Sequence, residues 1–556
     1  MQALSETYAR TIDAQVERLL CVQKPNGVFQ PEGESYHLYD QYVAYPLALA
    51  WLDPTSPYFR DGRVFDAVCR SGDLHAREMD EDGRWPLVTK GGDWGSSLDE
   101  WRMHFWLESL LLVEDDLDAP RRERWEEALR RGAKGLADFV RKLDEDGEID
   151  FRDGCVAGMS PNHLAWYMLA SRRAGMRYGE HDWVERADRL FADMVQGQNA
   201  DGFWFEYGAP AVMYNYVSLL AMGVYLDHLG ESAPPEIGAA VERGMDAQLA
   251  WTYPGGGLVA EIDGRNRYRP GGQLILPAAC ARWPRGAAAL RESARRLRAA
   301  EKIGGQALAF LSETARYLAR HEQPDETPAR LGTSWRGKGI AAGWRRRGAW
   351  QATLSGIVRP PYSGRFLTDV ANLVGLYHEG LGLLAGGGGS KDDPEWATFT
   401  VRPGGGEPVW QPDKSELAMD EAEDAVTLSY GAVRTRASVR LDAEGARVRL
   451  ERLTGEAPVT ARLLRPLPPG ACLKTPDDAM VLNIEQPLRL RLAQGGDVTV
   501  EGATYALPAG ATFVWPRMPF NPYNRDGVPD PGEAFAAFEV ELGEAGPTAA
   551  FRISEV

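Results

Sequence analysis

The sequence predicts a multidomain α+β protein: a ring of paired helices, called an (α/α) toroid, followed by an antiparallel β domain. Its 556 residues exceed one ordinary domain. The apolar pattern changes from helical to alternating near residue 325. A glycine turn also recurs through the helical half at intervals of 54 to 64 residues. We therefore expect the toroid over residues 1–325 and the β domain over residues 326–556.

The helical half contains segments in which apolar residues recur every three or four positions, the spacing of one helix face. The segments predicted as helices are Glu6–Leu20, Leu98–Val113, Arg121–Leu143, His163–Ala174, Asp182–Val195, Val212–Leu229 and Glu236–Leu249.

The repeated turn lies in KPNGVF, DEDGRW, DEDGEI, NADGFW and TYPGGGL, at Gly27, Gly83, Gly147, Gly202 and Gly256. Each interval accommodates two helices of ~20 residues with their connections. Repeated helix hairpins form either an open solenoid or a closed ring. We favour a ring of about six hairpins, because solenoid repeats are usually shorter. In a ring these aromatic-rich turns gather at one end and form a cleft.

After residue 325, short alternating stretches such as RVRLERL, LRLRLA and DVTVEGATYAL predict antiparallel strands. The run Gly386–Gly389 is expected to mark a strand's exit into a loop, because no phosphate-binding Lys follows it.

Composition excludes several classes of protein. Apolar residues make up 44% and charged residues 26%, as in soluble globular proteins. A net charge of −18 argues against nucleic-acid binding, and no apolar run is long enough to span a membrane. Five scattered cysteines without CxxC spacing argue against a disulfide framework and a zinc cluster. We expect no cofactor and no metal. The cytoplasm is the expected location, or secretion where a signal peptide has been removed; the oligomeric state is left open.

The segment GMSPNHLAWYM carries the first candidate site. Ser160 is a predicted N-cap and Pro161 the first helical residue, which places Asn162 and His163 in the first turn. The positive potential of a helix N-terminus favours anions, so this pair suits a carboxylate or an oxyanion. Taken alone, the segment fits a capped helix with a partly buried histidine better.

The next repeat, NADGFWFEYGAPAVMYNYV, leads through Trp204 and Glu206 into a helix with Tyr214 and Tyr216 in its first turns. At most two side chains of Tyr214, Asn215 and Tyr216 share the cleft face, and tyrosines at this spacing are commonly core residues.

An earlier loop and helix, GGDWGSSLDEWRMHFW, combine acidic and aromatic residues. Trp101 and His104 share one helix face, and Trp94 and Trp101 are the better candidates for stacking on sugar rings. The weaker cluster GESYHLYDQY offers Tyr36, His37, Tyr39 and Asp40. A third cluster, DGRNRYRPGG, offers Arg265, Arg267 and Arg269 as substrate-binding cations, or as a solvated loop in a chain with fifty-three arginines against nine lysines.

Asn-His-x-x-Trp-Tyr, followed by Asp-Gly-aromatic-x-x-Glu and Tyr-x-Tyr, resembles the toroid-plus-β-sandwich polysaccharide lyases, heparinase II/III-like or alginate-lyase-like. The resemblance is one of architecture over most of the chain and of motif over Asn162–Tyr216. It implies that the β domain is a sandwich and that Asn162 and His163 neutralise a uronate carboxylate. It also implies that Tyr214 or Tyr216 moves protons. Glu206 is a further catalytic candidate in the same motif, and Trp166 and Trp204, near the glycine loops, lie where a sugar could reach them.

The sequence departs from these families in RFLTDVANLVGLYHEG. Leu367 stands where the families have the His of a His-x-Asp pair, while Asp369 is kept. This argues against a family zinc site or a second catalytic histidine, and His378 is expected to be a strand residue. A calcium-like loop at Asn524, Asp526, Gly527 and Glu533 has Pro522 at its first ligand position, so calcium is not expected there.

The leading hypothesis is a lyase that cleaves a uronate-containing oligo- or polysaccharide by β-elimination. Donors aimed at the carboxylate stabilise the enolate-like state, often by ~3–4 kcal/mol each, and a nearby cation must activate the phenol. The alternatives are a non-catalytic glycan-binding protein and an inverting glycoside hydrolase with carboxylates about 6.5–9.5 Å apart. The carboxylates available to the hydrolase are Asp93, Asp99, Glu100, Asp201 and Glu206.

Overall fold

The structure, a computed structural model, describes residues 3–89, 92–156, 160–265, 274–321, 332–359, 364–404, 406–421, 423–543 and 546–556. The chain divides into two compact units. The helical unit comprises Met1–Phe205, Tyr214–Leu249 and Gln273–Arg330, and the sheet unit comprises Glu206–Met213, Ala250–Gly272 and Leu331–Val556. The predicted boundary at residues 325 and 326 falls outside the described residues and stays a prediction.

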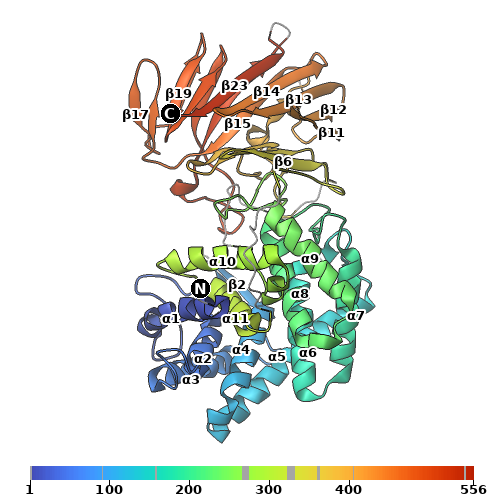
Figure 1. The fold of residues 1–556 in the computed structure, drawn as a ribbon, viewed down its shortest axis with the longest axis vertical. Coiled ribbons are helices and arrows are strands. Elements are labelled where there is room, and N and C mark those ends of the chain that lie inside the picture. The colour runs from blue at the N-terminus through green and yellow to red at the C-terminus, as the bar shows by residue number, and fades with distance from the viewer. Residues whose placement is uncertain are drawn as a thin grey trace. The chain divides into compact units, whose positions relative to one another are not determined.

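The helical unit is built from helix hairpins (Figure 1). Its helices are α1 (Leu4–Val22), α2 (Ala44–Leu52), α3 (Gly62–Glu78), α4 (Glu100–Val113), α5 (Ala119–Glu145), α6 (Pro161–Tyr178), α7 (His181–Gly197), α8 (Val212–Leu229), α9 (Pro235–Ala250), α10 (Pro284–Ala299) and α11 (Gly305–Leu318), with short 3₁₀ helices that include η1 (Leu38–Val43) and η4 (Ala278–Arg282). The hairpins are α1/α2, α3/α4, α5/α6, α7/α8, α9/η4 and α10/α11.

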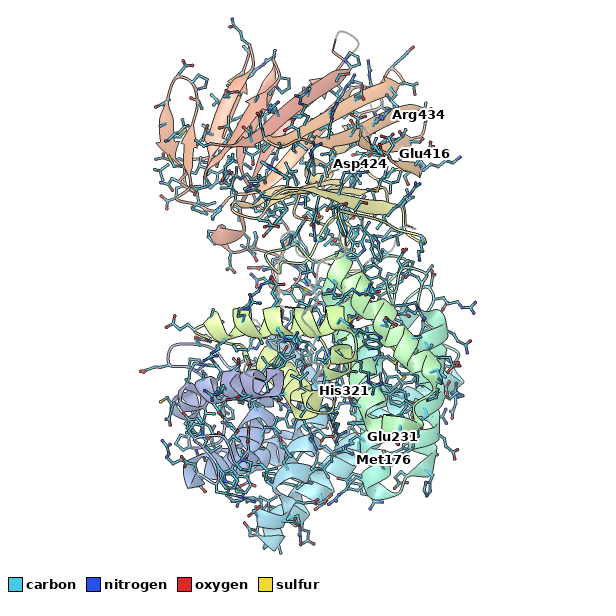
Figure 2. The ribbon with its side chains drawn as sticks, viewed as in Figure 1. Met176, Glu231, His321, Glu416, Asp424 and Arg434 are labelled. Carbon is cyan, nitrogen blue, oxygen red and sulfur yellow. The ribbon has the colours of Figure 1, made fainter. Side chains whose placement is uncertain are left out.

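The first helix of a hairpin is outer and the second is inner. The outer helices α3 and α7 bury one face, whereas the inner helices α4 and α6 are buried nearly all round. The ring is closed, because α11 packs against α1 and α2. Trp166 of α6 stacks on Phe310 of α11 at 5.3 Å between ring centroids. His321, which follows α11 (Figure 2), pairs with Asp227 of α8. In an open solenoid the first and last repeats would not meet, so the predicted toroid is confirmed.

The repeated glycines hold the turns that join outer to inner helices. Gly27, Gly83, Gly147, Gly202 and Gly256 all have positive φ, between 69° and 94°, a conformation that suits glycine. Three of them also touch the next outer helix. A Cβ atom on Gly27 would lie 2.2 Å from the Arg70 carbonyl oxygen, and one on Gly202 would lie 2.2 Å from that of Arg243.

All seven predicted helices are present, each with ends within four residues of the prediction. Helices α2, α3, α10 and α11 were not predicted. In α3 the apolar pattern is interrupted by Gly72, which the fold requires because a Cβ there would lie 2.0 Å from the Trp125 ring. Helix α2 is short and apolar nearly all round, so it lacks the one-sided pattern of an amphipathic helix.

Two small antiparallel ribbons lie between a glycine turn and an inner helix. The first, β1 (Trp85–Thr89) with β2 (Gly92–Ser97), precedes α4, and the second, β3 (Ile149–Asp150) with β4 (Cys155–Val156), precedes α6. No helix in the described part of the chain is long and apolar enough to cross a membrane.

Among the described residues, the sheet unit contains three antiparallel sheets, and strands of all three contribute to one large apolar core. The five-stranded sheets have the orders β5-β6-β7-β8-β9 and β10-β15-β22-β21-β18, and the nine-stranded sheet has the order β11-β12-β13-β14-β23-β20-β19-β16-β17. Their strands are β5 (Ser334–Arg336), β6 (Ala342–Arg347), β7 (Trp350–Ser355), β8 (Val374–His378), β9 (Gly382–Ala385), β10 (Phe399–Val401), β11 (Lys414–Met419), β12 (Asp424–Tyr430), β13 (Val433–Leu441), β14 (Gly445–Thr454), β15 (Val459–Pro466), β16 (Cys472–Lys474), β17 (Ala479–Val481), β18 (Leu488–Leu492), β19 (Gly496–Val500), β20 (Ala503–Leu507), β21 (Ala511–Arg517), β22 (Phe535–Leu542) and β23 (Thr548–Glu555).

The strands predicted from RVRLERL, LRLRLA and DVTVEGATYAL are β14, β18 and the β19–β20 hairpin. The glycine run follows β9 directly, as predicted. It makes room for a carboxylate: a Cβ on Gly386 would lie 2.2 Å from Glu261 Oε1, and the Gly387 amide donates to that oxygen at 2.9 Å.

Candidate functional site

The N-terminal ends of the inner helices gather polar and aromatic residues in the helical unit. In the helical unit, the turns at Gly27, Gly83, Gly147 and Gly202 each lead to the start of an inner helix, so these turns and helix starts share one end of the ring. Helices α4 and α6 begin there with Glu100 and Pro161. Their first-turn N–H groups lack partners within the helix, which gives this end a positive potential.

The central contact joins the first turns of α4 and α6. His163 Nδ1 donates to Glu100 Oε1 at 2.5 Å, and Glu100 is buried while the His163 side chain is 33% exposed. The carboxylate therefore fixes the imidazole's orientation and holds a proton on Nδ1. The other ring nitrogen, Nε2, is the atom that can act on a bound substrate.

Aromatic rings surround this pair. The Trp101 ring lies 4.9 Å from the His163 ring between centroids, and Tyr39 lies 6.3 Å from Trp101. Trp101 itself is only 6% exposed. The predicted aromatic clusters of residues 36–40 and 93–106 thus meet at the same place, and they limit how His163 can move.

Asn162 lies beside His163 in the sequence but is fully buried. Its Nδ2 donates to Ser160 Oγ at 2.8 Å. Ser160 is the N-cap residue, as predicted, yet its side chain makes no capping hydrogen bond to the helix. In this arrangement the Asn162 amide braces the start of α6, while His163 faces solvent.

Asp99, the N-cap of α4, is a second buried carboxylate at this end. The Tyr42 hydroxyl donates to it at 3.1 Å, and the Arg102 amide donates at 2.9 Å. Burial raises the pKa of Asp99 to about 6, although Arg102 opposes the shift. Because its oxygens are occupied by these donors, Asp99 caps the helix rather than facing the solvent.

His104 belongs to a different pair, one turn further into the ring. Its Nε2 lies 2.7 Å from Glu313 Oε1, and both side chains are fully buried. Sequence analysis predicted His104 as a substrate-binding residue on the face of Trp101. The structure corrects this prediction, because a fully buried imidazole cannot reach a ligand. His104 links α4 to α11 instead.

The predicted catalytic tyrosines lie at the start of α8, on either side of a buried asparagine. Asn215 accepts from the Trp204 amide at 3.2 Å and donates to Gln248 at 3.3 Å. Tyr216 packs against the helical core, and burial raises its phenol pKa to about 12. Tyr214 is half-buried.

The predicted tryptophans divide by exposure. Trp94, on β2, is 38% exposed and can present a ring face. Trp166 and Trp204 are at most 1% exposed, and their indole N–H groups donate to the carbonyls of Val217 and Met194 at 3.1 and 2.9 Å. The structure places both in the core, which corrects their predicted role in sugar binding. At these positions, large aromatic side chains are needed to fill the interior of the toroid close to a turn.

In the sheet unit, a buried ion pair joins two of the repeat loops. Glu206 Oε2 and Arg265 Nη1 are 2.6 Å apart, and their side chains are 2% and 10% exposed. Asp263 accepts from the amides of Arg265 and Met213 at 2.8 and 2.9 Å. The structure thus brings together Glu206, a predicted catalytic residue, and Arg265, a predicted substrate-binding residue, and each neutralises the other. Arg267 and Arg269 lie outside the described residues.

Two features of these sites were missed by sequence reasoning. Glu100 was considered only as a hydrolase carboxylate, and its pairing with His163 joins residues 63 positions apart that no local pattern connects. Tyr207 has φ of 53°, an uncommon backbone state for a bulky residue. The adjacent Gly208 is the one sequence signal of that tight turn.

Structural roles are also found for the remaining candidate carboxylates and for the segment in which the sequence departs from the lyase families. Asp93 accepts from the Gly95 amide, and Asp201 is 5% exposed. Asp369 accepts from Trp410 Nε1 and Gln411 Nε2 at 2.8 and 2.9 Å, and Leu367 is buried. His378 is a buried residue of β8, as predicted. No cluster of three or more His, Cys, Asp or Glu side chains suited to a metal occurs among the described residues.

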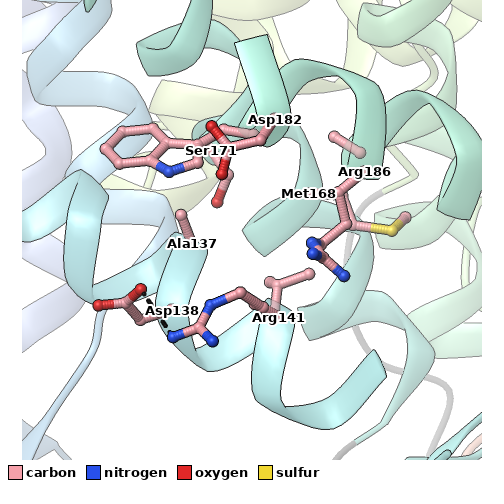
Figure 3. Close-up of a pocket in the computed structure, with 10 residues that line it drawn as sticks. Ala137, Asp138, Arg141, Met168, Ser171, Asp182 and Arg186 are labelled. Atoms are coloured by element: carbon pink, nitrogen blue, oxygen red, sulfur yellow. Dashed lines mark hydrogen bonds and ion pairs between the residues drawn. The ribbon is translucent and has the colours of Figure 1, made fainter. Parts of the chain in front are cut away.

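A small cavity lies away from all the predicted residues, between α5, α6 and α7 (Figure 3). It has about 30 Å³ of space for solvent, enough for a water or two. An ion pair between Asp138 and Arg141 at 3.3 Å borders it, with Ser171 and Trp183 also in its lining. It is too small for a sugar.

No protein-family model matches this sequence, and no curated protein matches it significantly. Similar folds are found among solved structures. Xanthan lyase from Paenibacillus has a TM-score of 0.52 at 12% identity, over 99% of this chain and 56% of that enzyme. The chain therefore spans little more than half of the xanthan lyase. Chondroitinase AC lyase has a TM-score of 0.52 at 12% identity, over 100% of this chain and 82% of its own.

The chondroitin AC lyase of Streptomyces coelicolor A3, solved in complex with chondroitin sulphate, has a TM-score of 0.50 at 11% identity, over 99% of this chain and 79% of its own. At such identities the similarity shows the fold. The predicted fold of toroid-plus-β-sandwich polysaccharide lyases is confirmed. The narrower resemblance to heparinase II/III-like or alginate-lyase-like families stays a prediction.

Proposed function

We propose that this protein is a polysaccharide lyase that cleaves a uronate-containing glycan by β-elimination. The observation that carries the proposal is the Glu100–His163 pair, a buried carboxylate that orients a part-exposed imidazole at the inner-helix end of the toroid. The fold shared with polysaccharide lyases supports the same reaction class. A uronate in particular is favoured by the imidazole and by the positive potential of the helix start.

In the proposed reaction, a base removes the proton on the carbon next to the uronate carboxylate. The electron pair forms a carbon–carbon double bond, the bond from the neighbouring carbon to the glycosidic oxygen breaks, and that oxygen takes up a proton. As the imidazolium that the Glu100 carboxylate stabilises, His163 would donate from Nε2 to the uronate carboxylate, where negative charge accumulates. Asn162 would act indirectly, by holding the start of α6.

Tyr214 is the proposed phenol that moves the proton. Tyr216 is the weaker choice, because burial raises its pKa to about 12 and its ring packs against the helical core. A phenol ionises near pH 10 when free, so a further rise removes it from the useful range of a base.

The test is an assay of the purified chain on glycans that contain glucuronate, iduronate, mannuronate or galacturonate. The expected product carries a double bond conjugated to the carboxylate, which is detected by ultraviolet absorbance and mass spectrometry. New reducing ends that form without this absorbance would instead identify a hydrolase. Binding without cleavage of any glycan would identify a non-catalytic protein. Either result would contradict the proposal.

A further inference from the structure

In the sheet unit, two loops far apart in the sequence bring Phe366 and Tyr523 together. Their ring centroids are 5.3 Å apart and their planes are inclined by 50°. Phe366 is 36% exposed, and the other exposed large aromatic residues among those described are Phe59 and Trp94. Exposed aromatic rings lose the stabilisation that burial would give, so a fixed pair on a surface requires an explanation.

The loop that carries Tyr523 is held in place. Arg365 Nε donates to the Pro522 carbonyl at 2.7 Å, and its Nη2 donates to the carbonyls of Asn524 and Arg525. The loop closes on itself through the Asn521 amide and the Gly527 carbonyl at 2.9 Å. Arg365 directly precedes Phe366. The residue that holds the Tyr523 loop therefore also fixes the position of Phe366. The pair is therefore preorganised.

The loop of Phe366 is also tied to the buried ion pair of the repeat loops. The Thr368 amide donates to the Gly264 carbonyl at 2.9 Å. The next residue, Arg265, has its guanidinium 5.9 Å from the centroid of the Phe366 ring. Three segments, around residues 264, 366 and 523, thus converge on one aromatic surface, and the buried Arg265–Glu206 pair lies beside it.

We infer that Phe366 and Tyr523 form a sugar-binding subsite, on which a sugar ring of a glycan stacks. The aromatic faces fit the apolar face of a sugar ring. Arg265 lies beside Phe366 with its charge already paired with Glu206, so it positions the Phe366 ring and does not select a carboxylate. The inference rests on the proposed function in naming a glycan as the ligand.

The inference is tested by calorimetric titration with uronate hexasaccharides and a neutral hexasaccharide of the same length. Phe366→Ala and Phe366→Leu are each expected to raise Kd for the uronate ligand by about 3–10-fold, because both remove the aromatic face. Phe366→Trp is expected to bind within about twofold of wild type. The matched control is Phe59→Ala, which removes an exposed ring of the helical unit and leaves Kd unchanged. Thermal midpoints confirm that each variant is folded.

Unchanged binding in Phe366→Ala would overturn the subsite. Full binding in Phe366→Leu would also overturn it, because binding would then depend on apolar packing, of the kind a protein partner needs, and not on an aromatic face. The outcome also separates this inference from the proposed reaction. A glycan bound through Phe366 but left intact contradicts the lyase and supports the subsite. A glycan cleaved with unchanged KM in Phe366→Ala supports the lyase and contradicts the subsite. A chain that binds no glycan contradicts both.

Discussion

The carboxylate of Glu100 and the imidazole of His163 are joined by a 2.5 Å contact between helices α4 and α6. The same helical unit holds a second Glu–His pair, Glu313 with His104, which is fully buried. The two pairs have the same chemistry and differ in access to solvent. The same substitution in each pair therefore separates the proposed function of the first from packing at the second.

Glu100→Gln is expected to lower kcat/KM by about 10²-fold, because the amide no longer holds a proton on His163 Nδ1 and its orientation is lost. Steady-state kinetics across pH measure the effect. In Glu313→Gln, the control, the active fraction retains its kcat/KM, and the free energy of unfolding falls by about 1–3 kcal/mol. Equal losses of activity in the two variants would mean that Glu100 serves packing alone.

Tyr214→Phe is expected to lower kcat by about 10² or more, the contribution of a positioned acid or base. Tyr216→Phe is expected to stay within about threefold of wild type, since that ring packs against the core and burial raises the pKa of its phenol. Single-turnover assays with saturating substrate isolate the chemical step. The reverse ranking would make Tyr216 the phenol.

Asp99 predicts a pH dependence of stability. Its pKa is about 6 in the folded chain and 3.8 when unperturbed, so the folded state holds more protons between these values. Stability contributed by this group therefore falls as pH rises from about 4 to about 6, by about 3 kcal/mol. Asp99→Asn keeps the cap and removes the titration. The difference in unfolding free energy between wild type and variant, measured by urea denaturation across this range, isolates the effect; a flat difference would contradict it.

Glu206→Gln is expected to destabilise the chain by about 3 kcal/mol, because it leaves the Arg265 charge buried without its carboxylate. Arg265→Met is expected to cost a similar amount. The double variant should be more stable than the sum of the two losses predicts. Chemical denaturation of the four proteins gives the coupling energy, and simple additivity would show that the pair contributes nothing as a unit.

The repeat glycines offer a matched pair of substitutions. Gly202→Ala is expected to cost about 3 kcal/mol or more, because its Cβ would meet the Arg243 carbonyl at 2.2 Å with φ of 91°. Gly147 also has a positive φ, 69°, but has open space around it. Gly147→Ala is therefore expected to lower the free energy of unfolding by only about 1 kcal/mol. Thermal unfolding followed by circular dichroism ranks the two, and equal losses would mean that the contact with the next helix has no energetic weight.

Local patterns predicted much of the fold. Most of the longer helices were found, and the glycine turns were found because positive φ limits the residues that fit there. Helix α3 was missed although it buries one face, since Gly72 interrupts its pattern, and α2 was missed because it has nine residues and no one-sided pattern. The closure of the ring rests on contacts between the first and last hairpins, which the repeat favoured without specifying.

The site was harder to predict than the fold. His163 was identified from its place at a helix start, but its partner Glu100 lies on another repeat. Trp166 and Trp204 have the composition of sugar-binding residues and the position of core residues. The exposure of each tryptophan depends on how far the neighbouring turn extends over the toroid. Contacts between repeats decide this, and the local sequence does not show it. Phe366 and Tyr523 carried no signal, since their pairing joins two loops of the sheet unit.

The turns around Gly27, Gly83 and Gly202 anchor to the following outer helix through close backbone contacts. The stretch between a glycine turn and the next inner helix varies in this chain, from the hairpin β1–β2 after the anchored Gly83 to the two-residue strands of β3–β4 after Gly147, which has no such anchor among the described residues. The helical toroid thus serves as a constant scaffold that carries variable loops. Grafting a hairpin from one such protein onto another should transplant ligand preference while leaving the melting behaviour of the recipient unchanged.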